Sequence, residues 1–152
     1  GGGFRQPLTQ QTIDRQIDAD NTLRNASDLK MNGAEIFNFT LKVVPKLIYS
    51  TLEASGLNIN EVDYFIFHQA NQFIIKQISK RFKVSDEKIP LSLAQFGNTS
   101  SASIPVTLVS QLSAALNTQS LQMLLVGFGV GYSWGAAALR LGPISSLGMI
   151  EI

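Results

Sequence analysis

The sequence predicts an α/β domain in which helices pack on a mixed sheet. Segments with apolar residues at three- to four-residue spacing alternate with short runs rich in β-branched and aromatic residues. Glycines separate the last two runs, which favours a tight turn between antiparallel strands. A length of 152 residues with 45% apolar content suffices for one domain with a sizeable core.

The amino-terminal part of the chain predicts a surface segment and then a long helix. Residues 1–31 are polar and lack a periodic apolar pattern, so we expect them to lead into a domain over residues 32–152. Residues 34–55 have apolar side chains at helical spacing, followed by a glycine stop. Because Pro45 inside this helix removes a backbone hydrogen bond and costs about 3 kcal/mol, we expect a kink, or a break near Val43.

The middle of the chain predicts a strand, a helix and a second strand. Residues 62–67 are a nearly continuous apolar run, as expected for a strand covered on both faces, and the run ends at His68. Residues 71–82 return to helical spacing, with Phe73 in the apolar stripe. Residues 88–93 are a candidate short strand.

The carboxyl-terminal part predicts a helix followed by two strands. Residues 101–116 have one apolar face, with Pro105 in the first turn, where proline is tolerated. Residues 121–126 and 136–141 are the two strands. The uncharged stretch 121–139 is long enough to span a bilayer, but its glycines divide it into short runs, so we expect strands and no membrane span.

Composition argues against several classes of function. Twelve Lys and Arg against eleven Asp and Glu give a net charge of +1, so no global field favours nucleic acid. The chain has no cysteine for a disulfide, a thiolate metal site or a nucleophile, and its single histidine argues against a zinc centre. The charged fraction of 15% is low and predicts that another subunit or domain covers part of the surface. The lack of a signal-peptide pattern favours an intracellular protein.

Polar residues interrupt the apolar framework in three places, at residues 68–71, 97–100 and 127–135. His68 directly follows a buried strand, which favours its neutral form, and a neutral imidazole or the Asn98 amide is able to donate to a developing oxyanion. Each residue has a structural alternative. A lone histidine is more often a satisfied structural residue, and an asparagine after glycine is more often a turn former or helix cap.

The glycine-rich stretch 127–135 also has two interpretations. It does not fit the Gly-x-Gly-x-x-Gly dinucleotide fingerprint, and the sequence has no Gly-x-x-x-x-Gly-Lys-Ser/Thr phosphate loop. Glycines let backbone N–H groups approach a ligand closely, as an oxyanion hole requires, or they merely permit a hairpin turn. The pattern alone leaves both interpretations open.

Four motifs occur in a fixed order: MNGAEIF, HQAN, GNTSSASIP and GFGVGYSWG. Together they resemble the C-terminal half of the thiolase-fold condensing enzymes, specifically β-ketoacyl-acyl-carrier-protein synthase III. The resemblance covers residues 31–141, and the leading GGGFR is similar to the segment that enters this half of the family. The fold it implies is a thiolase-like half with helices packed on a mixed sheet.

The resemblance implies a Cys-His-Asn active site in which His68 and Asn98 match the histidine and asparagine. In such enzymes the cysteine takes an acyl group from a thioester, and a malonyl thioester then loses carbon dioxide and attacks that group. Decarboxylation leaves an enolate, and two N–H donors, one from the imidazole and one from the amide, are suited to stabilise its oxygen. By the same resemblance, the backbone of Gly129, Val130 and Gly131 would stabilise the oxyanion formed on the acyl-cysteine.

Further roles follow from the resemblance alone. Gly33 and Asn71 match positions that line the pantetheine tunnel, and Lys80 and Arg81 match a basic surface that meets the acidic carrier protein. The implied partners are acyl-CoA or acyl-carrier-protein thioesters, malonyl-acyl carrier protein and the N-terminal half of the same enzyme. The implied protein is a cytoplasmic homodimer in fatty acid or related biosynthesis, with no cofactor and no metal.

The sequence departs from the family in three respects. The nucleophilic cysteine of the family lies in the N-terminal half, so we expect this chain alone to be inactive. The all-glycine loop of the family contains Val130 here, and Phe73 stands where a basic residue is common. Two alternatives stay open: a non-catalytic relative that binds acyl thioesters or acts as a scaffold subunit, and a structural α/β module without a ligand.

Overall fold

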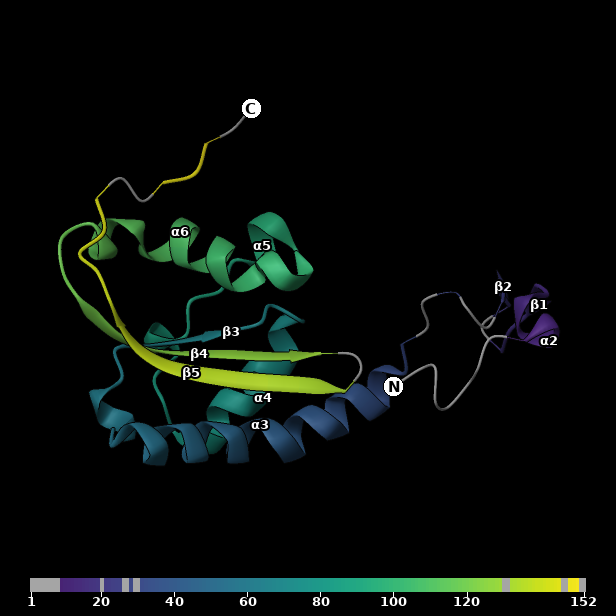
Figure 1. Ribbon diagram of the computed structural model, residues 1–152, viewed down its shortest axis with the longest axis horizontal. Helices are drawn as coiled ribbons and strands as arrows, with labels where there is room; N and C mark the ends of the chain where they lie inside the picture. The colour runs from purple at the N-terminus through teal and green to yellow at the C-terminus, as the bar shows by residue number, and fades with distance from the viewer. Residues whose placement is uncertain are drawn as a thin grey trace.

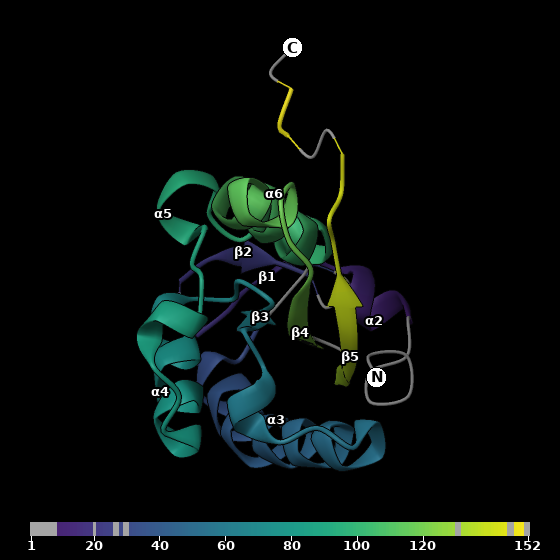
Figure 2. The same cartoon turned by 90° about the vertical axis from the view of Figure 1, so that its left-hand side faces the viewer.

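The chain folds in three layers in a computed structural model (Figure 1). A sheet lies between two layers of helices, and a view turned by 90° shows the same layers from the side (Figure 2). The structure describes residues 9–19, 21–25, 28, 31–129, 132–145 and 148–150.

The sheet has the strand order β3-β4-β5 and is mixed, as predicted. β3 (Tyr64–Phe67) runs parallel to β4 (Leu121–Gly129), with Phe67 opposite Val126. β4 runs antiparallel to β5 (Ser133–Leu141). Because β3 and β4 are parallel, their carboxyl ends lie at the same edge of the sheet, and the polar segments that follow them start there.

The helices cover both faces of the sheet. α3 (Gly33–Ser55) and α4 (Gln72–Phe82) lie on one face, and α5 (Leu93–Phe96) and α6 (Ser103–Leu116) lie over the other (Figures 1 and 2). The three predicted long helices are confirmed. Short 3-10 helices join these elements at η1 (Ile59–Glu61), η2 (Asp86–Lys88) and η3 (Ser100–Ala102).

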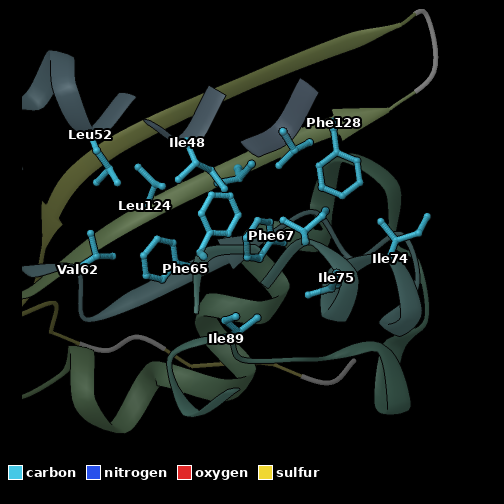
Figure 3. Packing of buried hydrophobic residues seen from close by; sticks show 14 residues of the cluster. Ile48, Leu52, Val62, Phe65, Phe67, Ile74, Ile75, Ile89, Leu124 and Phe128 are labelled. Atoms are coloured by element: carbon cyan, nitrogen blue, oxygen red, sulfur yellow. The ribbon is translucent and has the colours of Figure 1, made fainter. Parts of the chain in front are cut away.

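The larger hydrophobic core lies between the sheet and the pair α3 and α4, and includes 14 buried apolar residues (Figure 3). Phe65 and Phe67 of β3 point into it, whereas Ile66 belongs to a smaller cluster beneath α6. Successive side chains of a strand point to opposite faces, so β3 is covered on both sides, as predicted.

α3 is helical throughout, so the predicted break near Val43 is wrong. Pro45 has no N–H to donate to the carbonyl oxygen four residues earlier, which is that of Leu41. Arg81 of α4 supplies a donor, since its Nη1 lies 3.2 Å from the Leu41 oxygen. Gly56, with a φ of 69°, ends the helix as predicted.

The short strand predicted at residues 88–93 is also wrong, because a 3-10 helix and an irregular segment lead into α5 instead. Pro90 has no N–H, and the N–H of Ser92 donates to Oε1 of Gln69 at 3.1 Å. The backbone of this segment therefore bonds to a side chain and not to a neighbouring strand.

Phe73 does not belong to the buried stripe of α4. It is 61% exposed and stacks on Phe37 of α3, with ring centroids 5.5 Å apart. The stripe that faces the core instead includes Ile74, Ile75 and Ile78. Phe73 therefore lies beyond the edge of the apolar stripe and outside the core.

The predicted pair of carboxyl-terminal strands is confirmed, and both strands are longer than predicted. The uncharged stretch 121–139 contributes to β4 and β5. None of the helices in the described parts of the chain combines the length and the apolar character needed to cross a membrane.

The polar amino-terminal segment contains more regular structure than predicted. It has a one-turn helix, α2 (Gln10–Ile13), and two short antiparallel strands, β1 (Gln16–Ile17) and β2 (Leu23–Arg24). Figure 1 shows them to one side of the sheet, beyond the amino end of α3. The division into residues 1–31 and 32–152 stays a prediction.

Candidate active site

His68 lies where β3 ends, beside β4. Its backbone N–H donates to the Val126 carbonyl at 2.8 Å, which continues the parallel ladder by one residue. Its ring lies nearly perpendicular to the buried Phe128 ring in a T-shaped contact, with centroids 5.5 Å apart. The strand and the aromatic ring thus place the imidazole beside the carboxyl end of β4.

The His68 side chain is half-buried and held by one ring nitrogen. Its Nδ1 lies 2.7 Å from Oγ of Ser103, at the start of α6. Burial lowers the pKa of His68 below the ordinary value of 6.5, and the Ser100 backbone, which stabilises the protonated form of the ring, opposes this shift in part. The surroundings of the imidazole therefore favour its neutral form, as the sequence predicts.

Asn98 follows the end of α5 and is exposed. Gly97 ends this short helix with a φ of 64°, a conformation that favours glycine. The Asn98 Oδ1 accepts a hydrogen bond from the Ser100 N–H at 2.9 Å, so the oxygen is engaged and the amide NH₂ faces the other way. The Ser100 backbone also influences the pKa of His68, so the His68 and Asn98 side chains both lie beside Ser100.

A chain of hydrogen bonds extends from His68 into the interior. The Ser103 hydroxyl contacts the imidazole, and the backbone carbonyl of Ser103 accepts a hydrogen bond from Thr107 Oγ1 at 2.8 Å. The Thr107 hydroxyl also lies 2.8 Å from Ser92 Oγ, and the Ser92 N–H donates to Gln69. Gln69 Nε2 in turn donates to the Phe67 carbonyl at 3.0 Å. We call His68, Ser103, Thr107, Ser92 and Gln69 the buried polar chain.

The buried polar chain was not predicted from the sequence, although its residues left a pattern. Apart from His68 its members are almost fully buried, with exposures of 0 to 2%. Ser103 and Thr107 are polar residues four positions apart in the first half of a helix whose other residues there are apolar, and Ser92 interrupts an apolar run. Polar residues at buried helical positions usually have a partner, so this spacing was the available indication.

Gly33 and Asn71 are exposed and begin two helices. Asn71 is the N-cap of α4, where its Oδ1 accepts from the Ile74 N–H at 2.8 Å. Gly33 is the first residue of α3, and nothing lies within 4 Å of where its Cβ would be. No positive φ or close contact therefore demands glycine there.

The amino end of α3 meets the hairpin formed by β4 and β5. The Tyr132 hydroxyl donates to Glu35 Oε2 at 3.3 Å, and the rings of Phe39 and Tyr132 stack with centroids 4.4 Å apart. Gly129 is the last residue of β4, whereas Val130 and Gly131 lie outside the described residues. Gly129 thus lies at the same edge of the sheet as His68.

Lys80 and Arg81 lie in the last turn of α4, at the end of the helix remote from Asn71. Both are exposed, and Arg81 also donates to the Leu41 carbonyl. The structure therefore does not bring them together with His68 and Asn98. In the described part of the chain, no three His, Asp or Glu side chains gather closely enough to hold a metal ion.

Comparisons with known proteins point to one family. A family sequence model described as 3-Oxoacyl-[acyl-carrier-protein (ACP)] synthase III C terminal matches residues 52–141. The chain is 44% identical over 136 residues to beta-ketoacyl-[acyl-carrier-protein] synthase III of Streptococcus gordonii, a match that covers 88% of this chain and 42% of that protein. It is 34% identical over 146 residues to the chloroplastic beta-ketoacyl-[acyl-carrier-protein] synthase III B of Cuphea wrightii, covering 91% and 36%.

A solved structure agrees with the sequence matches. The crystal structure of 3-oxoacyl-(acyl-carrier protein) synthase from Burkholderia xenovorans LB400 matches with a TM-score of 0.81 at 43% identity, and covers 85% of this chain and 37% of that one. The chain spans about two-fifths of the length of these relatives. It belongs to the β-ketoacyl-[acyl-carrier-protein] synthase III family and is a C-terminal half of its thiolase-like fold.

Proposed function

We propose that this chain is the carboxyl-terminal part of an acyltransferase that condenses an acyl thioester with a malonyl thioester, in fatty acid or related biosynthesis. The observation that carries the proposal is the placement of His68 and Asn98 around the Ser100 backbone, beside the carboxyl ends of β3 and β4. Membership of the synthase III family supports the same reaction.

The proposed step begins when the malonyl thioester loses carbon dioxide and leaves an enolate whose oxygen carries negative charge. The His68 imidazole and the Asn98 amide donate hydrogen bonds to that oxygen, and no proton has to be removed from the substrate. The enolate carbon then attacks the carbonyl carbon of an acyl-cysteine, and the cysteine thiolate leaves. Fixed donors suit this reaction because they need no reorganisation as charge develops.

The nucleophile has to come from outside this chain, which contains no cysteine. We place it in the N-terminal half of the same enzyme, with backbone N–H groups near Gly129, Val130 and Gly131 stabilising the oxyanion on the acyl-cysteine. This chain alone is therefore expected to be inactive with acyl-CoA and malonyl thioester. Ketoacyl product above the blank, detected by mass spectrometry, would contradict this.

Substrate contacts complete the proposal. Gly33 and Asn71 line the path of the pantetheine arm; the Asn71 amide NH₂ is available because only its Oδ1 caps α4. Lys80 and Arg81 contribute to a basic surface for the acidic carrier protein. The primer is an acyl-CoA or an acyl-carrier-protein thioester, the extender is malonyl-acyl carrier protein, and the enzyme is a cytoplasmic homodimer.

The test uses the full-length polypeptide that contains this chain and compares two substitutions at Asn98. Asn98→Ala should lower malonyl decarboxylation and condensation by about 10²- to 10³-fold, the usual loss for one oxyanion donor. Asn98→Asp should be at least as damaging, because it replaces a donor with a negative acceptor. Acyl-cysteine formation should survive better, since it does not need the Asn98 amide.

Carbon dioxide release and mass-spectrometric acyl-cysteine formation are measured for each variant. Asn60→Ala, an exposed asparagine in η1 at the opposite end of β3, is the matched control and should match the wild type. Equal loss of loading and decarboxylation in a folded Asn98→Ala variant would refute the assigned role.

A second candidate is a non-catalytic relative of the same fold that binds acyl thioesters or acts as a scaffold subunit, and whose N-terminal half lacks the cysteine. The full-length polypeptide separates the two. Acylation of a cysteine by acyl-CoA supports the enzyme, whereas thioester binding without acylation supports the alternative.

A further inference from the structure

We propose that Ser103 is a positioning residue for His68: its hydroxyl donates to Nδ1, which fixes the ring and leaves the proton of the neutral imidazole on Nε2. This inference rests on the proposed function, because only there does the position of the proton affect a reaction. It concerns a residue in α6 that is 35 positions away from His68 in the sequence.

The direction of the hydrogen bond follows from the proton of the serine. Ser103 is 1% exposed, so its hydroxyl proton has little access to water. Within the part of the chain that the structure describes, Ser103 Oγ has one hydrogen-bonding partner, His68 Nδ1 at 2.7 Å. A buried donor without an acceptor is costly. The arrangement that satisfies the proton has Ser103 as the donor and Nδ1 as the acceptor.

The direction of this hydrogen bond also determines which ring nitrogen of His68 carries the proton. A neutral histidine carries hydrogen on one ring nitrogen and accepts at the other. Because Nδ1 accepts from Ser103, hydrogen is on Nε2, the nitrogen on the other side of the ring. That nitrogen is the donor that an enolate oxygen requires, and the opposite tautomer would present a lone pair to it.

The rest of the buried polar chain holds Ser103 in place. Thr107 uses its hydroxyl proton toward the Ser103 carbonyl at 2.8 Å, so at its contact with Ser92 it accepts. The backbone N–H of Ser92 in turn donates to Oε1 of Gln69, the residue that follows His68 in the sequence. These bonds join the start of α6, the segment before α5 and the end of β3. The position of the Ser103 hydroxyl relative to the His68 imidazole is therefore set both by α6, which contains Ser103, and by the segment after β3, which contains His68.

The first measurement is the tautomer itself. The full-length polypeptide is labelled with ¹⁵N-histidine, and the His68 signals are assigned by their absence in His68→Gln. At pH 7.5 we expect a protonated Nε2 and an unprotonated, hydrogen-bonded Nδ1. In Ser103→Ala we expect exchange between the two tautomers. A protonated Nδ1 in the wild type, or an unchanged spectrum in Ser103→Ala, would overturn the proposal.

The second measurement is the reaction. Ser103→Ala should lower malonyl decarboxylation about tenfold, as expected for one lost buried hydrogen bond, with KM unchanged and acyl loading affected less. Ser103→Thr keeps the hydroxyl and should restore the wild-type tautomer. Ser101→Ala, an exposed serine in η3, is the matched control and should change neither the spectrum nor the rate.

The two measurements separate the two proposals. The expected tautomer in an enzyme that neither decarboxylates nor condenses would refute the proposed function and leave the Ser103 contact intact. A normal decarboxylation rate in Ser103→Ala, with Asn98→Ala impaired, would refute the role of Ser103 and leave the proposed function intact.

Discussion

The two faces of the three-stranded sheet use buried polar groups in different ways. On the α3 and α4 side, the buried hydroxyls of Thr40 and Ser79 donate to carbonyls of their own helices, at 2.6 and 3.0 Å. On the α6 side, Ser103 and Ser92 instead bond across to other segments. On the α3 and α4 side, the buried polar side chains bond within their own helix. On the α6 side, they connect different segments of the chain.

This difference distinguishes the groups that stabilise the fold from the groups that orient a particular side chain. Apolar burial is roughly proportional to area and has no preferred direction, so the 14-residue cluster stabilises the fold without orienting any one side chain. Hydrogen bonds are directional, and their buried groups are costly when unpaired. The buried polar chain is therefore suited to orient His68, whereas the apolar cluster is suited to stabilise the fold.

The largest effect is expected in the apolar layer. Phe65 is 1% exposed and lies in the larger cluster, so Phe65→Ala should lower the free energy of unfolding by about 3–5 kcal/mol. Urea denaturation measures this, with Phe65→Leu as a milder control. The His68 tautomer of the folded protein should be unchanged. A loss below about 1 kcal/mol would show that the layer does not dominate stability.

A matched pair of threonines compares the two faces directly. Thr107 and Thr40 are both fully buried and both donate to the carbonyl four residues earlier, but only Thr107 also accepts, from Ser92. Thr107→Val leaves the Ser92 hydroxyl without this partner and should cost about 1–3 kcal/mol. Thr40→Val should be close to neutral, because the carbonyl of Ile36 keeps its helical partner. Equal effects in denaturation would contradict the contrast.

A third prediction concerns a polar contact on the apolar face. If Arg81 replaces the donor that Pro45 lacks, Arg81→Ala should cost about 1 kcal/mol in the wild type. Pro45→Ala restores an N–H to the Leu41 carbonyl, so the same arginine substitution should cost less in that background. A double-mutant cycle measures this coupling, and additive effects would show that the two residues act independently.

The smallest effect is the pH dependence that His68 contributes. Because its pKa is lowered in the folded protein, the unfolded chain binds a proton first as the pH falls through 6.5. The free energy of unfolding should therefore fall more between about pH 7.5 and pH 5.5 in the wild type than in His68→Gln. Parallel denaturation curves for the two proteins over this range would contradict the lowered pKa.

Patterns of near neighbours were enough for most of the fold. The periods of about 3.6 and 2 predicted the three long helices, the strand before His68 and the terminal hairpin, and the structure confirms them. The errors arose where a distant group overrides the local rule. Arg81 lies 40 positions from the Leu41 carbonyl that it satisfies, so no local pattern showed that α3 would continue through Pro45.

The candidate site divides in the same way. Motifs and their order pointed to His68 and Asn98, because the residue types and their places after a strand and a glycine are local features. The choice of Ser103 as the partner of Nδ1, and the link to Ser92 and Gln69, were decided by the packing of α6 against the end of β3. Hydrogen bonds between segments depend on where those segments lie in space, and spacing along the chain does not contain that information.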